Sequence, residues 1–281
     1  MEPLSSDAIR PVGVIGAGHS GTTIVYRMLA LHPDATWFSQ YSQLALTGPP
    51  GLRTAAAALD GALRRRFPHD WKKVQRSSGW RRGVPTPIEG AGLWDGVFGG
   101  EPAAEVSVLR IRSIVDAACA AARRRAIVVK PPGRYRSRCA PLISEAYPRS
   151  AYLHVARDGR AVALSVLQKW TRGARRERTA LLTNASDHWR RALRQIREYE
   201  QDLPVETIRY EALCADVHGQ LRRALTFAGL DADRFPYHSV PPTLTSTNAA
   251  RLKRAGSDEL AALDRLLADD LQRYGYASDL P

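Results

Sequence analysis

The chain has 281 residues and carries 41 basic against 28 acidic side chains, a formal net charge of +13. Hydrophobic residues make up 44% and charged residues 25%, which excludes a disordered or fibrous chain, and no apolar run approaches the roughly 20 residues of a membrane span. The positive charge favours anionic ligands, small molecules as well as nucleic acid. We expect a cytoplasmic protein, because no secretory signal pattern is seen and the three cysteines lie far apart.

Short apolar runs alternate with helical patterns along the chain. The near-continuous apolar character of the runs is typical of parallel strands covered on both faces. We therefore predict one α/β domain over residues 1–281, with a parallel sheet flanked by helices. Strands are expected at Val12–Ile15, Thr36–Phe38, Ile127–Val129, Tyr152–Ala156 and Glu206–Tyr210, and helices at Thr22–Leu31, Ser107–Arg125, Leu181–Gln201, Val217–Ala228 and Asp258–Tyr274, the last with Ser257 as its N-cap.

Residues 48–105 interrupt this alternation. The segment is rich in proline and glycine and carries Trp71, Trp80 and Trp94. Long segments without a clear periodic pattern are often functional in compact domains. We predict an irregular insertion on the rim of the sheet, within the same domain.

A glycine-rich turn joins the first predicted strand to the first predicted helix. It reads Gly-Ala-Gly-His-Ser-Gly-Thr-Thr over residues 16–23. Glycines let the backbone turn sharply and bring N–H groups close to an anion, and the start of a helix adds unpaired donors and a partial positive charge. Ser20, Thr22 and Thr23 add hydroxyl donors. The turn therefore predicts a phosphate-binding loop, although a turn without a ligand would need only some of these residues.

Three kinds of ligand compete for this loop. Gly16, Gly18 and Gly21 match the dinucleotide fingerprint of a flavin or nicotinamide oxidoreductase, but the acid expected about 20 residues later is absent after Thr36–Phe38. The P-loop of a kinase needs a lysine where Thr22 stands. A sulfonated nucleotide needs neither that lysine nor a metal, because a sulfuryl group carries less negative charge than a terminal phosphoryl group. Such a donor requires a second anion site for its 3′-phosphate.

A second anion site is predicted after the strand Tyr152–Ala156. Arg157 directly follows this strand, where ligands gather in open α/β sheets, and Ser165 lies on the helix that comes next. A guanidinium fork and a hydroxyl group together suit a phosphate. The competing interpretation is structural, with Arg157 paired to Asp158 and Ser165 packed.

Together these two segments resemble those of the 3′-phosphoadenylyl sulfate-dependent sulfotransferases. Residues 19–23, His-Ser-Gly-Thr-Thr, are similar to the family's motif of Lys or Arg followed by Ser-Gly-Thr-Thr or Ser-Gly-Thr-Ser. Residues 157–165 are similar to its Arg-Asp-x-Arg-x-x-x-x-Ser motif, with Asp158 and Arg160 also matching. Looser likenesses are Ile208–Leu213 and the pair Gly275-Tyr276. The likeness runs from residue 12 to about residue 276 and skips residues 48–105.

The resemblance implies a P-loop-like parallel sheet flanked by helices. It implies transfer of a sulfuryl group from 3′-phosphoadenylyl sulfate to a hydroxyl group, or less readily an amine, with release of adenosine 3′,5′-bisphosphate and without a metal. The glycine loop would hold the 5′-phosphate, Arg157 and Ser165 the 3′-phosphate, and Tyr210 would approach the adenine, while a late basic loop would close over the 3′-phosphate. The donor-binding residues implied in this way are Gly18, His19, Ser20, Gly21, Thr22, Thr23, Arg157, Ser165, Tyr210, Arg251 and Lys253.

Two residues are assigned to catalysis through the same resemblance. His19 stands where the family has a lysine or arginine that stabilises charge on the departing oxygen. A protonated imidazole could do this work, which would make activity sensitive to pH, and a neutral one could still donate a hydrogen bond. Lys130 ends a strand and is expected against the transferring group.

The base that takes the acceptor's proton has no residue in the family's usual positions. Pro132 stands in the position of a histidine used by one branch, and Ser39 and Gln40 stand in that of a glutamate used by another. We predict Glu89, a carboxylate among prolines and glycines beside Trp94, as the base; with no base the chain would be a non-catalytic nucleotide-binding protein. The other candidates are Asp60, His69, Asp70, Asp95, Glu101 and Glu105. His188 is an alternative, although its place beside Trp189 at the start of a helical pattern favours packing.

The acceptor side is expected in the mixed basic and aromatic segment Leu63–Lys73, followed by Trp80–Arg82. Aromatic rings stack on sugars and basic groups hold anions, so the segment suits a small-molecule or glycosylated acceptor, including an anionic one. It equally suits a surface helix that packs through Phe67 and Trp71. Arg172–Arg178 is expected as a loop, either a lid or a solvated run of charge. Neither nucleic acid nor a membrane is expected as a partner.

Overall fold

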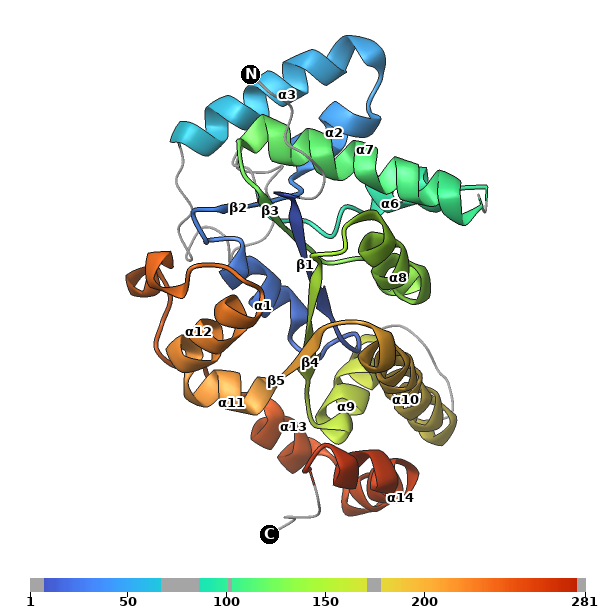
Figure 1. Cartoon of the computed structure of the whole chain (residues 1–281). Coiled ribbons are helices and arrows are strands. Elements are labelled where there is room, and N and C mark those ends of the chain that lie inside the picture. Colours follow the sequence, from blue (N-terminus) through green and yellow to red (C-terminus); the bar gives the residue numbers. More distant parts are fainter. Residues whose placement is uncertain (1–7, 67–85, 101–102, 171–177, 277–281) are drawn as a thin grey trace.

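The structure is a computed structural model that describes residues 8–66, 86–100, 103–170 and 178–276. Five parallel strands form one sheet in the order β2-β3-β1-β4-β5, which confirms the predicted sheet (Figure 1). The strands are β1 (Arg10–Ile15), β2 (Ala35–Trp37), β3 (Ala126–Val129), β4 (Ala151–Ala156) and β5 (Val205–Arg209).

Helices cover both faces of the sheet, because alternate strand residues enter two different apolar clusters. Val12 and Val14 of β1 pack in the cluster that includes α1 and α12. Ile127 and Val129 of β3 pack in the cluster that includes α7 and α8. The helices are α1 (Thr22–Leu29), α2 (Gln40–Thr47), α3 (Pro50–Arg66), α6 (Ala91–Phe98), α7 (Ala104–Ala122), α8 (Arg136–Ala146), α9 (Gly159–Trp170), α10 (Arg178–Asp202), α11 (Tyr210–Ala215), α12 (Val217–Phe227), α13 (Asn248–Arg254) and α14 (Ser257–Arg273).

The strand order places the ends of β1 and β4 side by side. From β1 the chain moves to β2 and β3 on one side of the sheet and then crosses to β4 and β5 on the other. Ile15 of β1 is paired with His154 of β4. Open α/β sheets bind ligands where the direction of winding reverses, at the carboxyl ends of the strands. The order also separates β2 from β1, whereas the dinucleotide-binding fold pairs these two strands.

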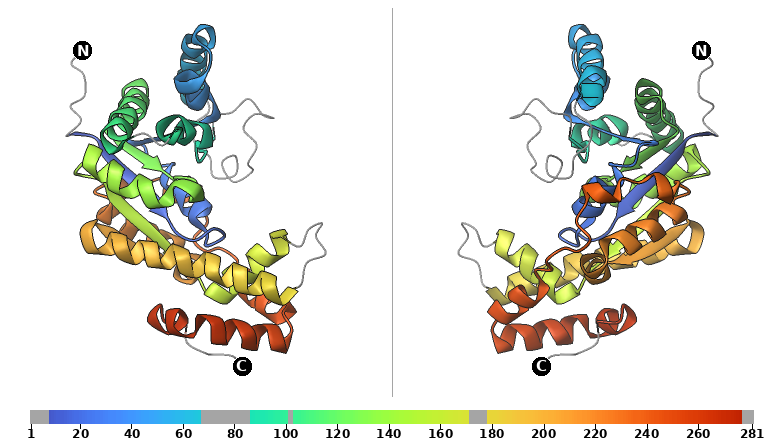
Figure 2. Two further views of the ribbon diagram at one scale, coloured as in Figure 1. Left: turned by 90° about the vertical axis from the view of Figure 1, so that its right-hand side faces the viewer. Right: turned by 90° about the vertical axis from the view of Figure 1, so that its left-hand side faces the viewer.

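The segment 48–105 is more regular than predicted. Its described part contains α3 and α6 and the start of α7, and in Figure 2 α3 stands at the outer end of the molecule, away from the sheet. No helical pattern was recognised for α3 in the sequence, because its buried face uses small residues such as Ala56 while Leu52 and Leu59 are 52% and 45% exposed. The pattern of hydrophobic and polar residues therefore did not predict this helix. At the other end of the chain, α14 begins at Ser257, so Gly256 and not Ser257 is its N-cap.

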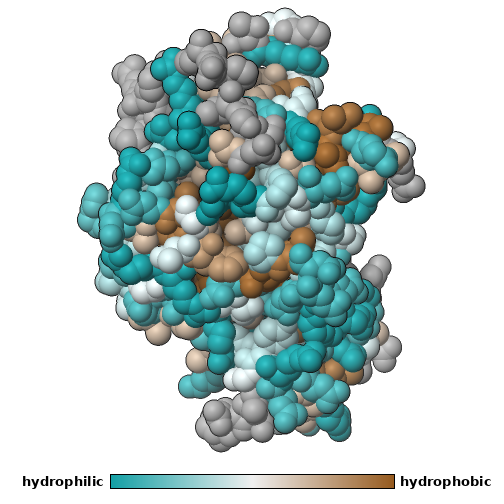
Figure 3. Space-filling view, viewed as in Figure 1, coloured by the Kyte–Doolittle hydropathy of each residue, from teal (hydrophilic) through white to brown (hydrophobic). Residues whose placement is uncertain are grey.

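The surface agrees with the composition. The face drawn in Figure 3 is mostly hydrophilic, with hydrophobic side chains gathered near its middle and beside α6 and α7 at the upper right. Leu109 of α7 is 64% exposed. Within the described part of the chain, no helix combines the length and the apolar character that crossing a membrane requires.

We predict that Gly13→Ala destabilises the fold. A Cβ at Gly13 would lie 2.5 Å from Cδ1 of Tyr152 on the neighbouring strand. That ring cannot move away easily, because its hydroxyl donates to the Ala140 carbonyl at 2.7 Å and lies 2.9 Å from Ser144 Oγ. Overpacking of this kind costs about 1–3 kcal/mol, measurable as a lower free energy of unfolding in urea.

Gly96→Ala is the matched control, because nothing lies within 4 Å of a Cβ at this position in α6. Its helix propensity should raise stability by about 0.5–1 kcal/mol. Equal stability changes for the two variants would show that the contact between Gly13 and Tyr152 does not limit packing of the sheet.

Candidate active site

The glycine loop leaves β1 and forms the first turn of α1. Gly21 is the N-cap of α1 with a φ of 101°, a left-handed conformation that favours glycine. A Cβ there would also lie 2.6 Å from Cδ2 of Tyr210. Gly21 therefore fits this position for two reasons, backbone conformation and close packing of an aromatic ring.

A cavity of about 420 Å³ opens beside this loop. Several groups that the sequence assigned to the site converge on it, among them His19, Lys130 and Glu89. Its lining residues are Val14, Ile15, Gly16, Ala17, Gly18, His19, Thr22, Thr23, Glu89, Lys130, Pro131, Gly133, Cys139, Ala140, Tyr152, Lys169 and His188.

Arg157 turns toward the glycine loop and not toward Asp158. Its Nη1 donates to the His19 carbonyl at 2.9 Å, its Nε to Asn248 Oδ1 at 2.8 Å and its Nη2 to Thr247 Oγ1 at 2.8 Å. A guanidinium carries five N–H donors, so these three contacts leave two for an anion. Burial lowers the pKa of Arg157, which reflects the cost of holding a charge there.

Asp158 and Arg160 of the same motif serve the structure instead. Arg160 Nη2 lies 2.9 Å from Asp158 Oδ2, and Arg160 Nη1 donates to Asp264 Oδ1 of α14 at 3.0 Å. Both members of the Asp158–Arg160 pair are buried. The pair therefore links the start of α9 to α14.

The guanidinium of Arg157 lies over the aromatic ring of Tyr210. The Arg157 Cζ atom lies 4.3 Å from the centre of the Tyr210 ring, and a Cβ at Gly21 would lie against the same ring. Tyr210 is only 4% exposed and also belongs to the apolar cluster on one face of the sheet. Contact between Tyr210 and an adenine stays a prediction.

The two looser likenesses, Ile208–Leu213 and the pair Gly275-Tyr276, meet at the carboxylate of Glu211. Glu211 Oε1 accepts from Asn248 Nδ2 at 2.5 Å and from the Asp158 backbone N–H at 3.2 Å. Glu211 Oε2 accepts from the Tyr276 hydroxyl at 2.8 Å. Glu211 thus fixes Asn248, which in turn accepts a hydrogen bond from Arg157.

His19 connects the two predicted anion sites. Its Nδ1 lies 3.0 Å from Ser165 Oγ, while its carbonyl accepts from Arg157. Burial lowers the pKa of His19, and the charges of Lys169, Arg251 and Arg157 lower it further. Since the ordinary pKa of histidine is about 6.5, His19 is neutral at pH 7 and above, and the protonated imidazole considered from the sequence is disfavoured.

The hydroxyl groups of the loop fit an oxyanion. Ser20 is 1% exposed, and within the described residues its Oγ has no hydrogen-bond partner. Buried polar groups without a partner are rare, and a bound ligand is one common explanation. Thr22 and Thr23 line the adjoining cavity. The donor set, made of hydroxyls, backbone N–H groups at a helix start and a buried guanidinium, suits phosphate.

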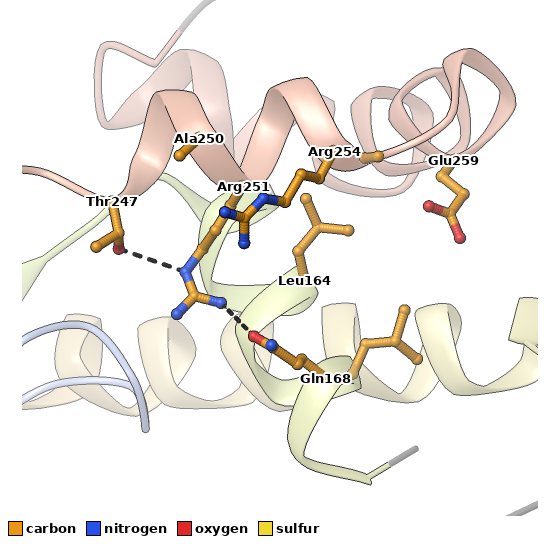
Figure 4. A pocket seen from close by; sticks show the side chains of 9 residues that line it. Leu164, Gln168, Thr247, Ala250, Arg251, Arg254 and Glu259 are labelled. Carbon is orange, nitrogen blue, oxygen red and sulfur yellow. Dashed lines mark hydrogen bonds between the residues drawn. The ribbon is translucent and has the colours of Figure 1, made fainter. Parts of the chain in front are cut away.

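Only one of the two late basic residues is brought to the site. Arg251 of α13 donates from Nη1 to Gln168 Oε1 at 2.9 Å and from Nε to Thr247 Oγ1 at 3.3 Å (Figure 4). It lines a second cavity, of about 410 Å³, between α9, α13 and α14. Lys253 is exposed on α13 and lines neither this cavity nor the one beside the glycine loop.

Glu89 and Lys130 form an ion pair at the cavity, although 40 residues separate them in the chain. The backbone beside Glu89 runs along the end of β2: Ser39 bridges Pro87, and the Ile88 N–H donates to the Phe38 carbonyl at 2.9 Å. These contacts bring Glu89 next to the positions where the family's glutamate is missing. The sequence could not indicate this, because the insertion approaches the site only after folding.

The remaining candidates for the base lie elsewhere or outside the described residues. Asp60 is buried on α3 and accepts from Ser39 Oγ at 2.7 Å, and it lines a separate cavity of about 150 Å³. Asp95 is exposed and bonded to Tyr135 and Arg134, and Glu105 is exposed in the first turn of α7. The candidates His69, Asp70 and Glu101, the aromatic part of the expected acceptor segment and the loop 171–177 lie outside the residues that the structure describes.

Sequence reasoning missed Lys169, which lies near the end of α9 and lines the cavity. His188 of α10, an alternative base for which packing was favoured, lines the cavity too. A Cβ at Gly18 would lie 2.9 Å from His188 Nε2, so this imidazole rests on the glycine loop. The spacing of Ser165 and Lys169, one helical turn apart, was the available signal for Lys169. Within the described residues, no group of three or more His, Cys, Asp and Glu side chains could hold a metal ion.

Solved structures resemble this chain over nearly its whole length. Sulfotransferase STF9 from Mycobacterium avium is similar with a TM-score of 0.60 and 17% identity, over 95% of this chain and 77% of that one. Sulfotransferase STF1 from Mycobacterium tuberculosis is similar with a TM-score of 0.54 and 16% identity, over 93% of this chain and 77% of that one. The sulfotransferase domain of the Synechococcus PCC 7002 olefin synthase is similar with a TM-score of 0.50 and 19% identity, over 100% of this chain and 99% of that one. Identities this low establish the fold alone.

The sequence itself decides the family. No curated protein matches the chain. Residues 11–234, which include the glycine loop, Lys130 and the Arg157–Ser165 segment, match the model of a sulfotransferase family. Neither the oxidoreductase nor the kinase interpretation is favoured. With Arg157 at the end of β4 bonded to the glycine loop that follows β1, this chain belongs to the sulfotransferase family and is an enzyme that transfers a sulfuryl group.

Proposed function

We propose that the donor is 3′-phosphoadenylyl sulfate and that the acceptor is a hydroxyl group of a small-molecule or glycosylated compound. The observation that carries this proposal is the direct link between the two anion sites: Arg157 donates to the carbonyl of His19, and Ser165 is bonded to its ring. One nucleotide with phosphates at both its 3′ and 5′ positions suits two such sites side by side. Gly18, Ser20, Gly21, Thr22 and Thr23 would hold the 5′-phosphate.

The 3′-phosphate would be held by Arg157 and Ser165, with Arg251 near them. Arg251 lies close enough to lower the pKa of both His19 and Arg157. Lys253 would have to approach from the exposed side of α13. When bound, the donor supplies a sulfuryl group, whose S–O bond to the 5′-phosphate breaks as a bond to the acceptor oxygen forms.

Glu89 would take the acceptor's proton, and Lys130 would orient it. The Glu89 carboxylate lines the cavity, and its ion pair with Lys130 places a cation beside the carboxylate that would receive the proton. A carboxylate is a sufficient base for a hydroxyl group whose oxygen is forming a bond to sulfur. The segment that carries Glu89 is fixed further by Tyr26, whose hydroxyl donates to the Ile88 carbonyl at 2.9 Å.

The cytoplasm is the compartment that we propose for this enzyme. Cys119, Cys139 and Cys214 are free and buried. Burial raises the pKa of the Cys119 thiol to about 12, so this thiol is inert at neutral pH. Unpaired buried thiols are typical of proteins from reducing compartments.

We predict that Arg157→Ala weakens binding of adenosine 3′,5′-bisphosphate by about a hundredfold, because charge-assisted hydrogen bonds to the 3′-phosphate are lost. Adenosine 5′-monophosphate should lose less than about threefold, measured by titration calorimetry. Arg222→Ala is the control, because this arginine is exposed and paired with Asp233. Equal losses for both nucleotides would contradict the assignment of the second site.

We predict that Glu89→Gln lowers the rate of sulfuryl transfer by about a hundredfold or more, the usual contribution of a general base. Binding of adenosine 3′,5′-bisphosphate should be unchanged. The assay uses radiolabelled donor with the best acceptor from a panel of sugars, phenols and natural-product scaffolds. Asp95→Asn, six residues along the chain and outside the cavity lining, should keep its activity. Full activity of Glu89→Gln would assign the proton to another group.

We predict that chelation with EDTA leaves turnover unchanged, and that added Mg²⁺ does not increase it. The chemical reason is the lower charge of a sulfuryl group, which side-chain cations can balance, whereas phosphoryl transfer relies on a metal. Loss of turnover in EDTA with recovery on adding Mg²⁺ would instead favour a metal-dependent mechanism.

A further inference from the structure

The glycine loop carries no cation of its own toward the departing 5′-phosphate. The side chain in the relevant position is His19, which is bonded to Ser165 and neutral at pH 7 and above. Breaking the sulfuryl bond leaves an electron pair and negative charge on the phosphate oxygen. Charge of this kind is stabilised by a positioned cation or by hydrogen-bond donors. A cation from another segment would add to the hydrogen-bond donors that the loop itself supplies.

The other cations near the loop already have partners. Lys130 is paired with Glu89. Arg157 donates to His19, Thr247 and Asn248, and Arg251 donates to Thr247 and Gln168. These two arginines lie on the side of His19 that faces α13. They are thus placed for the 3′-phosphate rather than for the loop.

Lys169 meets the requirement. It lines the same cavity as Thr22 and Thr23, and among the described residues it forms no hydrogen bond or ion pair. It follows Ser165 by one turn of α9, so both side chains leave the same face of the helix. Among the charges that lower the pKa of His19, that of Lys169 has the largest effect.

We propose that Lys169 supplies the positive charge that stabilises the departing 5′-phosphate oxygen, in place of the basic residue that the glycine loop lacks. This inference rests on the proposed donor. The sulfur–oxygen bond to the phosphate breaks, its electron pair stays on the phosphate oxygen, and the ammonium group of Lys169 stabilises that charge while keeping its own proton. The acceptor's proton goes to Glu89. In this proposal the cation is carried by the end of α9 and not by the glycine loop.

The first test is binding, with adenosine 3′,5′-bisphosphate and adenosine 3′-monophosphate as probes in titration calorimetry. Lys169→Gln should weaken the bisphosphate by roughly tenfold, the value of a hydrogen bond to a charged group at a partly exposed site, and should leave the 3′-monophosphate unchanged. Lys169→Arg should keep both affinities. The control is Arg194→Gln, which removes the same charge from an exposed position on α10 and should change neither.

The second test moves the charge back to the loop. Lys169→Gln should lower the rate of sulfuryl transfer by tenfold or more, and His19→Lys in the same chain should restore most of it. Rescue of the first substitution by the second would show that the two positions serve one function.

The outcomes distinguish failure of the role proposed for Lys169 from failure of the proposed donor. A Lys169→Gln variant that binds both nucleotides and turns over like the wild type would overturn the role of Lys169, and so would an equal loss of both nucleotides. Failure of the wild-type protein to bind adenosine 3′,5′-bisphosphate would overturn the proposed donor itself.

Discussion

The guanidinium of Arg157 is the interaction on which the site depends. It lies at the end of β4, over the ring of Tyr210, and joins the glycine loop after β1 to the start of α13. Among the described residues no carboxylate pairs with it directly, and its acceptors are a carbonyl, an amide and a hydroxyl group. A buried charge held only by neutral groups is costly. An anionic ligand would remove this cost, so the fold prepares the site for one.

The rigidity of this arrangement comes from hydrogen bonds and close packing around Arg157. Glu211 binds Asn248, the backbone at Asp158 and the hydroxyl of Tyr276, and so connects β4, α13 and the C-terminal segment. Motifs that seem weak in the sequence acquire a physical meaning here: they hold Arg157 in place. Gly21 contributes in the same way, because only a residue without a Cβ lets Tyr210 pack against the loop.

The two charged groups that we propose for catalysis, Glu89 and Lys169, come from different segments of the chain. Glu89 reaches Lys130 because residues 86–88 run beside the end of β2, which leaves the insertion's carboxylate at the cavity. Lys169 reaches the glycine loop from the end of α9. In the proposed mechanism, each residue supplies a charge that the chain lacks at the family's usual positions. Electrostatic stabilisation depends on where a charge lies and not on which segment carries it.

The sequence by itself determined the parallel α/β sheet, the glycine loop and the pairing of that loop with Arg157 and Ser165, because hydrophobic periodicity and loop composition are local properties. It missed α3, whose buried residues include Ala56 and Asp60, and it did not place His188 against Gly18. Only the tertiary structure decided that His19 contacts both Arg157 and Ser165, that Glu89 meets Lys130 and that Lys169 lines the cavity beside the loop. Those contacts join residues that are distant in the chain or depend on the packing of several helices, and no local pattern records them.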